Sequence, residues 1–300
     1  MADDVIKTRG LTRYYGKTRG ILDLDLTVKA GEVYGFLGPN GAGKTTTIRL
    51  LLDIIRPNRG ESWVFGLDSR ADGVAIRRRV GYLPGELSLY PSMTARQYLD
   101  MVAGVRGQAA DGYRQELCER LQFDPERRMR TYSRGNKQKV GLVAAFMGKP
   151  DLLILDEPTT GLDPIVQAAV LDLVREARAE GRTVFFSSHV LSEVQEVCDW
   201  AGIIRDGQLV STESVEALIR QQFRRVQLTF SSPPPPGVFA LEGVSESARD
   251  GNTVTLEVRQ SLNAVLEKAA GIGVIDIETP PVSLEEVFLA YYSGKGDGHA

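Results

Sequence analysis

The sequence predicts an α/β fold built on a parallel sheet, followed by a small C-terminal α+β domain. From residue 38 onward, helical patterns alternate with short and fully apolar strand patterns, such as LLILD at 152–156 and TVFFSS at 183–188. Such strands lack polar alternation because a parallel sheet is covered on both faces. Four consecutive prolines at 233–236 can continue neither a helix nor a central strand, so they separate this region from a mixed remainder.

The elements follow in order along the chain. The first 37 residues read as short strands separated by turns. Helices are expected at 43–54, 94–105, 112–122, 136–148, 164–179, 190–198 and 214–223, and further strands near 82 and at 201–207. The Asp-Gly pair at 206–207 precedes QLV and therefore predicts a β-hairpin.

The composition break sets the expected domain boundaries. We place the first domain at 1–222, with a helical subdomain at about 86–150, and the second domain at 223–292. The second domain has the pattern of a small split β-α-β sandwich, with a hairpin turn at 250–251, a helix at about 260–270 and a final amphipathic helix, SLEEVFLAYY. The tail at 293–300 is expected to be disordered.

Bulk composition excludes several classes of protein. The net charge of −3 argues against a dedicated nucleic-acid binder, because affinity for phosphate backbones comes from clustered positive charge. The basic runs at 77–79 and 127–128 are expected to be solvated faces. Cys118 and Cys198 form no spacing motif, which favours a reducing compartment without a structural disulfide. No apolar run approaches the roughly 20 residues that span a bilayer, and the N-terminus lacks a signal peptide.

A phosphate-binding loop is the strongest local motif. GPNGAGKT at 38–45 fits G-x-x-x-x-G-K-[ST] and lies between an apolar strand and a helix. Its glycines let backbone N–H groups surround phosphates, and the helix N-terminus favours anions. Lys44 can reach the β- and γ-phosphates of a nucleotide, and the Thr45 hydroxyl can ligate Mg²⁺. A glycine-rich turn that merely begins a helix is the alternative, and the complete pattern in this context disfavours it. The nucleotide-binding candidates in this loop are Gly38, Pro39, Asn40, Gly41, Ala42, Gly43, Lys44, Thr45 and Thr46.

Two carboxylates supply the complement to this loop. The apolar strand in LLILDE at 152–157 delivers Asp156 to its end, where the carboxylate can hold Mg²⁺ directly or through water. Glu157 follows, placed to orient or deprotonate an attacking water. Alone, the pair would equally suit solvated groups or a helix cap. With the loop upstream it indicates hydrolysis of a phosphoanhydride.

The segment YSRGNKQK at 132–139 has the chemistry of a second phosphate site. The order GPNGAGKTT, YSRGNKQK, LLILDEPTTGLDP and SSH resembles the ATP-binding subunit of an ATP-binding-cassette (ABC) transporter over about residues 4–222. The resemblance implies a P-loop NTPase cassette with a parallel-sheet core, an antiparallel β subdomain and a helical subdomain.

The resemblance also explains why one chain has two phosphate sites. It implies that Ser133, Gly135 and Asn136 form a signature that grips the γ-phosphate of ATP held by a second copy's P-loop. Two chains would then form a head-to-tail homodimer with two ATP molecules between them. The alternative for Ser133 is an ordinary helix N-cap.

Further roles are implied residue by residue. Tyr15 matches the aromatic residue that stacks on adenine, although an ordinary hairpin aromatic is the alternative. Asp163 matches the D-loop that communicates between the two sites, and His189 matches the switch histidine that hydrogen-bonds the γ-phosphate. The expected catalytic residues are therefore Lys44, Glu157 and His189, and the expected metal ligands are Thr45 and Asp156.

Three positions depart from the family pattern. Gly85 stands where many members have a glutamine that contacts Mg²⁺ and the nearby water, so Glu86 or a water molecule would have to supply that contact. Arg134 and Asn136 replace a glycine and a glutamine of the signature. Asn136 keeps the amide chemistry, whereas Arg134 fits only if its side chain points away from the phosphates.

The segments GYLPGELSLYPSMT and SLEEVFLAYY, with the C-terminal domain, are similar to those of ATPase subunits of ABC-2-type drug, antibiotic or lipid exporters. The expected function is therefore ATP hydrolysis that drives export through a separate six-helix transmembrane permease, docked near 81–100. The chain would be peripheral, at the cytoplasmic face of the cell membrane, with no nucleic-acid partner. The alternatives are an importer ATPase subunit and a soluble ABC ATPase that acts on the ribosome or DNA.

Overall fold

The chain divides into two compact units, Met1–Val215 and Glu216–Ala300. The computed structural model describes residues 3–107, 112–221 and 224–280. The division falls at helix α8 (Val215–Gln221), and the boundary expected after 222 lies just beyond that helix. The expected final helix SLEEVFLAYY and the expected tail at 293–300 lie outside the described residues.

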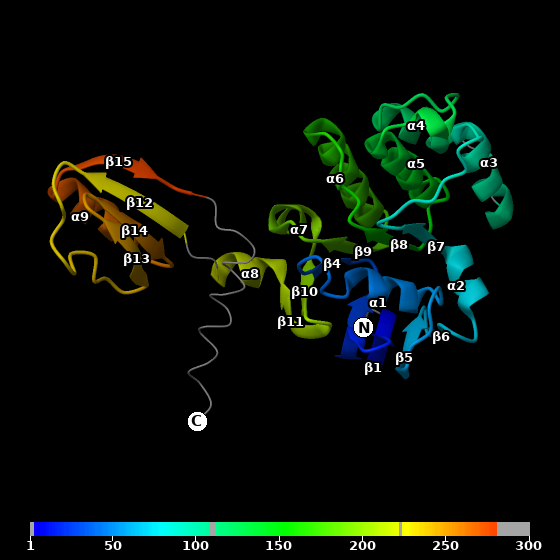
Figure 1. The fold of residues 1–300 in the computed structure, drawn as a ribbon, viewed down its shortest axis with the longest axis horizontal. Coiled ribbons are helices and arrows are strands. Elements are labelled where there is room, and N and C mark those ends of the chain that lie inside the picture. Colours follow the sequence, from blue (N-terminus) through cyan, green and yellow to red (C-terminus); the bar gives the residue numbers. More distant parts are fainter. Residues whose placement is uncertain (1–2, 108–111, 222–223, 281–300) are drawn as a thin grey trace. The chain divides into compact units, whose positions relative to one another are not determined.

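A six-stranded, mostly parallel sheet is the centre of the first unit (Figure 1). Its strands, in spatial order, are β11 (Gln208–Ser214), β10 (Trp200–Arg205), β4 (Val33–Leu37), β9 (Thr183–Ser188), β8 (Leu152–Asp156) and β7 (Val80–Leu83). Only β11 is antiparallel, and it follows β10 through the expected Asp206-Gly207 hairpin. Every residue of β4, β8 and β9 is buried, as expected for strands covered on both faces.

An antiparallel sheet packs beside this centre. It contains β1 (Asp4–Tyr15), β2 (Thr18–Leu24), β3 (Thr27–Lys29), β5 (Arg59–Val64) and β6 (Leu67–Asp68), in the order β2-β1-β5-β6 with β3 paired to β1. Side chains such as Ile6 and Leu11 join Phe36, Ile48 and Phe185 in one apolar core. That shared core ties the phosphate-binding loop to both sheets.

The helices cover the central sheet and form a helical subdomain (Figure 1). They are α1 (Lys44–Leu51), α2 (Gly73–Arg79), α3 (Ala95–Arg106), α4 (Gly112–Arg120), α5 (Arg134–Phe146), α6 (Pro164–Ala179) and α7 (Leu191–Val197), with a 3₁₀ turn at Met129–Thr131. α3 and α4 both pack on α5, whereas α6 and α7 pack on β9. Among the described residues, the helices expected from the sequence are present within a few residues of the expected bounds, and α2 is an addition.

The second unit is an antiparallel sheet with one helix. The strand order is β13 (Val244–Asp250), β14 (Thr253–Val258), β12 (Arg224–Phe230) and β15 (Val274–Glu278), with α9 (Leu262–Gly271) joining β14 to β15. Alternate residues of β12 and β14 are buried and share a core with the α9 residues Val265 and Ala269. The turn at 250–251 joins β13 to β14, as the sequence predicted.

The two basic runs lie on the surface, as the sequence predicted. The residues of 77–79 and 127–128 are exposed. Across the described residues, no helix combines the length and the apolar character needed to cross a membrane.

Candidate functional site

The phosphate-binding loop is a tightly constrained turn between β4 and α1. Gly43 caps α1 with φ at 112°, a conformation that other residues rarely adopt. A Cβ at this position would also lie 2.7 Å from Ile21 Cγ2. The Lys44 ammonium donates hydrogen bonds to the carbonyl oxygens of Gly38 (2.6 Å) and Pro39 (3.2 Å). The lysine therefore folds back over its own loop, where a phosphate would bind.

A cavity of about 270 Å³ opens beside this loop. It collects residues from β1, β2, the loop, α1 and the segment after β8. The lining residues are Tyr15, Arg19, Gly20, Asn40, Gly41, Gly43, Lys44, Thr45, Thr46 and Glu157. The fold thus places the expected adenine-stacking residue, the loop and the second carboxylate around one cavity.

Asp156 lies at the carboxyl end of β8 and is fully buried. Its carboxylate accepts two hydrogen bonds from hydroxyl groups, one on each oxygen. Thr45 Oγ1 donates to Oδ2 at 2.7 Å, and Ser187 Oγ donates to Oδ1 at 2.6 Å. Because the carboxyl ends of parallel strands meet at one edge, residues more than 100 positions apart in the sequence converge here.

The donor atoms around Asp156 suit a hard divalent cation. A carboxylate beside a threonine hydroxyl offers oxygen ligands, which Mg²⁺ prefers, and Mg²⁺ usually keeps several waters and binds substrate phosphates as well. Within the described residues, no group of three or more His, Cys, Asp or Glu could hold a metal.

Glu157 has its backbone in the left-handed region, with φ at 51°. Its N–H donates to both the carbonyl oxygen (3.2 Å) and the hydroxyl (3.1 Å) of Ser187. The side-chain amide of Gln138 on α5 donates to the carbonyl oxygens of Glu157 and Pro158, each at 3.3 Å. These contacts hold an unfavourable backbone conformation in place and so fix the direction of the carboxylate.

The Glu157 carboxylate is where the expected catalytic residues meet. Oε1 lies 3.2 Å from Lys44 Nζ and 3.4 Å from His189 Nδ1. The Lys44 side chain is 5% exposed and that of His189 is 42% exposed. One end of the cluster is therefore shielded from water while the other remains open.

Tyr15 lies at the end of β1 and is 43% exposed. The Arg13 guanidinium lies 5.0 Å from the centroid of its ring, a cation–π arrangement. The ring is thus placed by a neighbour at the mouth of the cavity that the loop lines.

The signature segment is built differently from the loop. Ser133 caps α5, and its hydroxyl accepts a hydrogen bond from the Asn136 N–H at 3.2 Å. Ser133 and Arg134 are exposed, and a Cβ at Gly135 would lie 2.8 Å from the Gly161 carbonyl oxygen. Among the residues that line the loop cavity, none comes from this segment. Within one chain, the structure therefore does not bring this segment to the cavity beside the phosphate-binding loop.

Asp163 is also a helix cap in this structure. Its side chain caps α6 by accepting a hydrogen bond from the Val166 N–H at 3.1 Å, and Pro164 follows at the first helical position. It does not line the loop cavity.

The loop after β7 reaches the carboxylate without a side chain. A Cβ at Gly85 would lie 3.1 Å from Asp156 Oδ2. Glu86 is exposed and, in the part of the chain that the structure describes, forms no hydrogen bond or ion pair with Thr45 or Asp156. Nearby, burial and, to a smaller extent, the charge of Asp156 raise the pKa of Tyr82 to about 12.

Four residues of this site were not expected from the sequence: Arg19, Gly20, Gln138 and Ser187. Arg19 and Gly20 line the cavity, and the other two hold the backbone at Glu157. Two serines at the end of the otherwise apolar strand TVFFSS were the only signal for Ser187. Because Ser187 pairs with Asp156 across β8 and β9, the first of these serines lies at the site.

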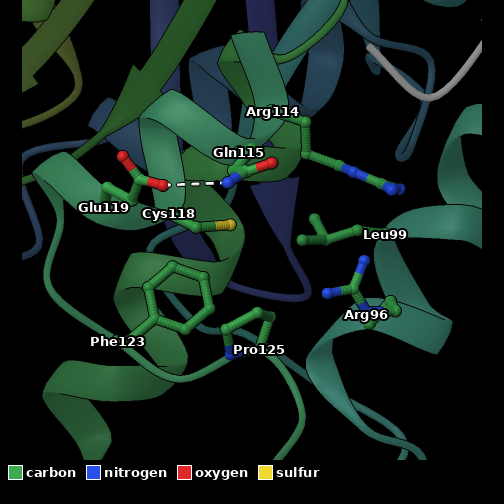
Figure 2. Close-up of a pocket in the computed structure, with 8 residues that line it drawn as sticks. All are labelled: Arg96, Leu99, Arg114, Gln115, Cys118, Glu119, Phe123 and Pro125. Carbon is green, nitrogen blue, oxygen red and sulfur yellow. Dashed lines mark hydrogen bonds between the residues drawn. The ribbon is translucent and has the colours of Figure 1, made fainter. Parts of the chain in front are cut away.

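A second cavity, of about 360 Å³, lies in the helical subdomain (Figure 2). Its lining residues are Arg96, Leu99, Arg114, Gln115, Cys118, Glu119, Phe123 and Pro125. Figure 2 shows the Cys118 sulfur among these side chains, with Gln115 donating a hydrogen bond to Glu119. None of the residues expected to bind nucleotide or metal lines it.

Comparison with known proteins identifies both parts of the chain. A family described as "ABC transporter" matches residues 21–160, and one described as "ATP-binding protein DrrA1-3-like, C-terminal domain" matches residues 217–292. The bacitracin transport ATP-binding protein BcrA of Bacillus licheniformis is 37% identical over 230 residues, which are 76% of this chain and 75% of that protein. The daunorubicin/doxorubicin resistance ATP-binding protein DrrA of Streptomyces peucetius is 33% identical over 301 residues, covering 95% of this chain and 91% of that protein.

Solved structures show the same cassette fold. A structure titled as the ATP binding subunit of an ABC transporter superposes with a TM-score of 0.66 at 28% identity, covering 72% of this chain and 92% of that one. An ATP-binding cassette solved as a dimer with ADP and Pi has a TM-score of 0.64 at 20% identity and covers 70% of this chain and 98% of that one; it supports the fold alone. With the relatives above, these matches show that the chain belongs to the ABC transporter family, as an ATP-binding subunit with ATPase activity.

Proposed function

We propose that this chain hydrolyses ATP at the cluster of Lys44, Asp156, Glu157 and His189 and thereby drives export of a drug, antibiotic or lipid-like substrate through a separate membrane subunit. The convergence of Lys44 and His189 on one oxygen of Glu157 carries the proposal for the chemistry. A carboxylate held between two cationic or hydrogen-bonding groups is well placed to orient and deprotonate water.

Each residue has a distinct proposed task. The N–H groups of the loop and Lys44 bind the phosphates, and Glu157 accepts a proton from the attacking water. His189 hydrogen-bonds the γ-phosphate, and Tyr15 stacks on adenine. Thr45 and Asp156 would hold Mg²⁺, which supplies charge neutralisation at the phosphates.

The signature is proposed to act on the nucleotide of a second chain. Ser133 and Arg134 are exposed, and the loop cavity includes no signature residue. A site completed by another copy, in a head-to-tail homodimer with two ATP molecules between the chains, accounts for both observations. ABC cassettes form dimers, and a structurally similar cassette solved as a dimer supports the proposal. Asp163, at the start of α6, is proposed to link the two sites.

The membrane partner is proposed to be a six-helix permease at the cytoplasmic face of the cell membrane, with this chain bound peripherally. The docking surface is placed near 81–100, where Tyr90 is 56% exposed. The relatives' names, bacitracin transport and daunorubicin/doxorubicin resistance, support an exporter. The match to a DrrA1-3-like C-terminal domain supports it further, and neither an importer nor a soluble ribosome- or DNA-bound ATPase has comparable support.

The test is a pull-down of the tagged chain from detergent-solubilised native membranes. We expect a polytopic membrane protein to co-purify, and we expect Tyr90→Asp to reduce its recovery. Co-purification of ribosomes or DNA in place of a membrane protein would overturn the transport role. Recovery of a solute-binding protein that stimulates the ATPase would instead mark an importer.

A further inference from the structure

We infer that Ser187 is a positioning residue for ATP hydrolysis, because its hydroxyl orients the Asp156 carboxylate and the Glu157 backbone at the same time. The inference rests on the roles proposed above for these two carboxylates. It adds a residue that touches neither nucleotide nor water in the proposed mechanism and that acts through its neighbours.

The Ser187 hydroxyl forms hydrogen bonds with both of the residues that it is inferred to position. Ser187 is fully buried near the end of β9 and pairs with Asp156 across the parallel strands β8 and β9. Its Oγ donates to Asp156 Oδ1 at 2.6 Å and accepts the Glu157 N–H at 3.1 Å. A single hydroxyl therefore bridges two consecutive residues of the site.

The bond to Asp156 assigns a separate partner to each carboxylate oxygen. With Oδ1 held by Ser187, Oδ2 is left to Thr45, the residue proposed to share Mg²⁺ with Asp156. Rotation of the carboxylate about its Cβ–Cγ bond would exchange the two oxygens, and the Ser187 hydrogen bond opposes that rotation.

The loop after β7 makes this orientation depend more heavily on Ser187. Gly85 faces Asp156 Oδ2 with no side chain, and a Cβ there would lie only 3.1 Å from that oxygen. Glu86 is exposed. Neither residue supplies a hydrogen-bond donor from its side chain, so two hydroxyl groups, those of Thr45 and Ser187, orient the carboxylate.

The bond to Glu157 acts on the backbone. The left-handed conformation of Glu157 is uncommon for a residue with a side chain, and it persists only where surrounding contacts determine it. Ser187 accepts the Glu157 N–H with both its carbonyl and its hydroxyl oxygen. Loss of the hydroxyl would loosen the aim of the Glu157 carboxylate toward Lys44 and His189.

The experiment compares Ser187→Ala with Thr183→Val in the full-length protein. Thr183 lies at the opposite end of β9, is 2% exposed, and accepts one hydrogen bond from the Gly31 N–H at 3.0 Å. The control therefore removes a buried hydroxyl from the same strand, away from the site. Three quantities are measured for each variant: kcat, KM for ATP, and binding of trinitrophenyl-ATP with and without Mg²⁺.

For Ser187→Ala we expect kcat to fall about 10- to 100-fold, as for other supporting residues around a metal site. The affinity for trinitrophenyl-ATP without Mg²⁺ should stay within about twofold, because the residue does not touch the nucleotide, whereas the KM for ATP in the presence of Mg²⁺ should rise. The gain in trinitrophenyl-ATP affinity that Mg²⁺ gives to the wild type should shrink. Thr183→Val should match the wild type in all three measurements.

Two results would overturn the inference: wild-type values of all three quantities in Ser187→Ala, or equal losses in both variants, which would indicate strand stability alone. Glu157→Gln is measured in parallel. If Glu157→Gln keeps full turnover, the proposed role of Glu157 fails, and the inference fails with it. If Glu157→Gln is inactive while Ser187→Ala is unaffected, the inference alone is wrong.

Discussion

The N-termini of α1 and α5, which carry the phosphate-binding loop and the proposed signature, are surrounded to very different degrees. At α1, Lys44 is 5% exposed and contacts two loop carbonyls and the Glu157 carboxylate. At α5, Ser133 is exposed, and its hydroxyl accepts a hydrogen bond from the N–H of Asn136 in its own helix. The chain completes the first site with its own residues. The second is presented outward, as expected of a surface that another molecule must complete.

The largest effect is expected on ATP turnover, when the Glu157 carboxylate is removed from the site at α1. Glu157→Gln removes the proton acceptor and should lower ATP turnover about 10²- to 10⁴-fold. ATP should still bind, so the variant should accumulate as an ATP-bound dimer in size-exclusion chromatography. Glu61→Gln alters an exposed carboxylate that pairs with Arg9 and serves as the control. A Glu157→Gln variant that turns over at the wild-type rate would contradict the assignment.

The next largest effect is expected on the affinity for ATP. Lys44→Ala removes a buried ammonium from the phosphate loop, and loss of charge-assisted hydrogen bonds should weaken ATP binding about 10- to 100-fold. Isothermal titration calorimetry would measure the change. Lys149→Ala, which removes an exposed ammonium paired with Glu180, should leave the affinity unchanged. Equal affinity in Lys44→Ala and the wild type would count against the loop as the phosphate site.

A smaller effect tests whether the exposed N-terminus of α5 takes part in dimerisation. Ser133→Ala should cost about 1 kcal/mol of folding stability, the usual loss for a helix cap. It should leave ATP binding by the monomer intact while weakening ATP-dependent dimerisation. Thr94→Ala removes the comparable cap of α3 and should cost similar stability without affecting the dimer. If both variants dimerise equally well with ATP, Ser133 is a cap and nothing more.

The smallest expected effect compares two thiols, that of Cys118 in α4 and that of Cys198 at the end of α7. Burial raises the pKa of both Cys118 and Cys198, and Cys198 is raised well above the ordinary value. A raised pKa lowers the thiolate fraction at any given pH, so both should alkylate more slowly than a free cysteine at pH 8. Cys118 borders a cavity (Figure 2) and should react first, as mass spectrometry after iodoacetamide treatment would show. Faster labelling of Cys198 would contradict this order.

Three elements with a weak local pattern, β5, β6 and α2, were not predicted from the sequence. The first half of β5 is exposed and polar, so RGESWV has no clear strand alternation, and it becomes a strand only by pairing with β1. The two-residue strand β6 depends in the same way on β5. α2 carries the basic run at 77–79, which was recognised as exposed but not as helical. Pairing with β1, which is distant in sequence, decided β5, and β6 then followed from its neighbour β5.

The sequence by itself determined the alternation of strands and helices, the phosphate loop and the two carboxylates after β8. These features are local, because a loop needs its glycines and a buried strand its apolar residues within a few positions. Only the tertiary structure decided which other residues contact these features. Parallel pairing brings Ser187 to Asp156, packing of α5 brings Gln138 to the carbonyl of Glu157, and the loop after β7 brings Gly85 to Asp156 Oδ2. Such contacts depend on strand order and helix placement, which no short stretch of sequence encodes.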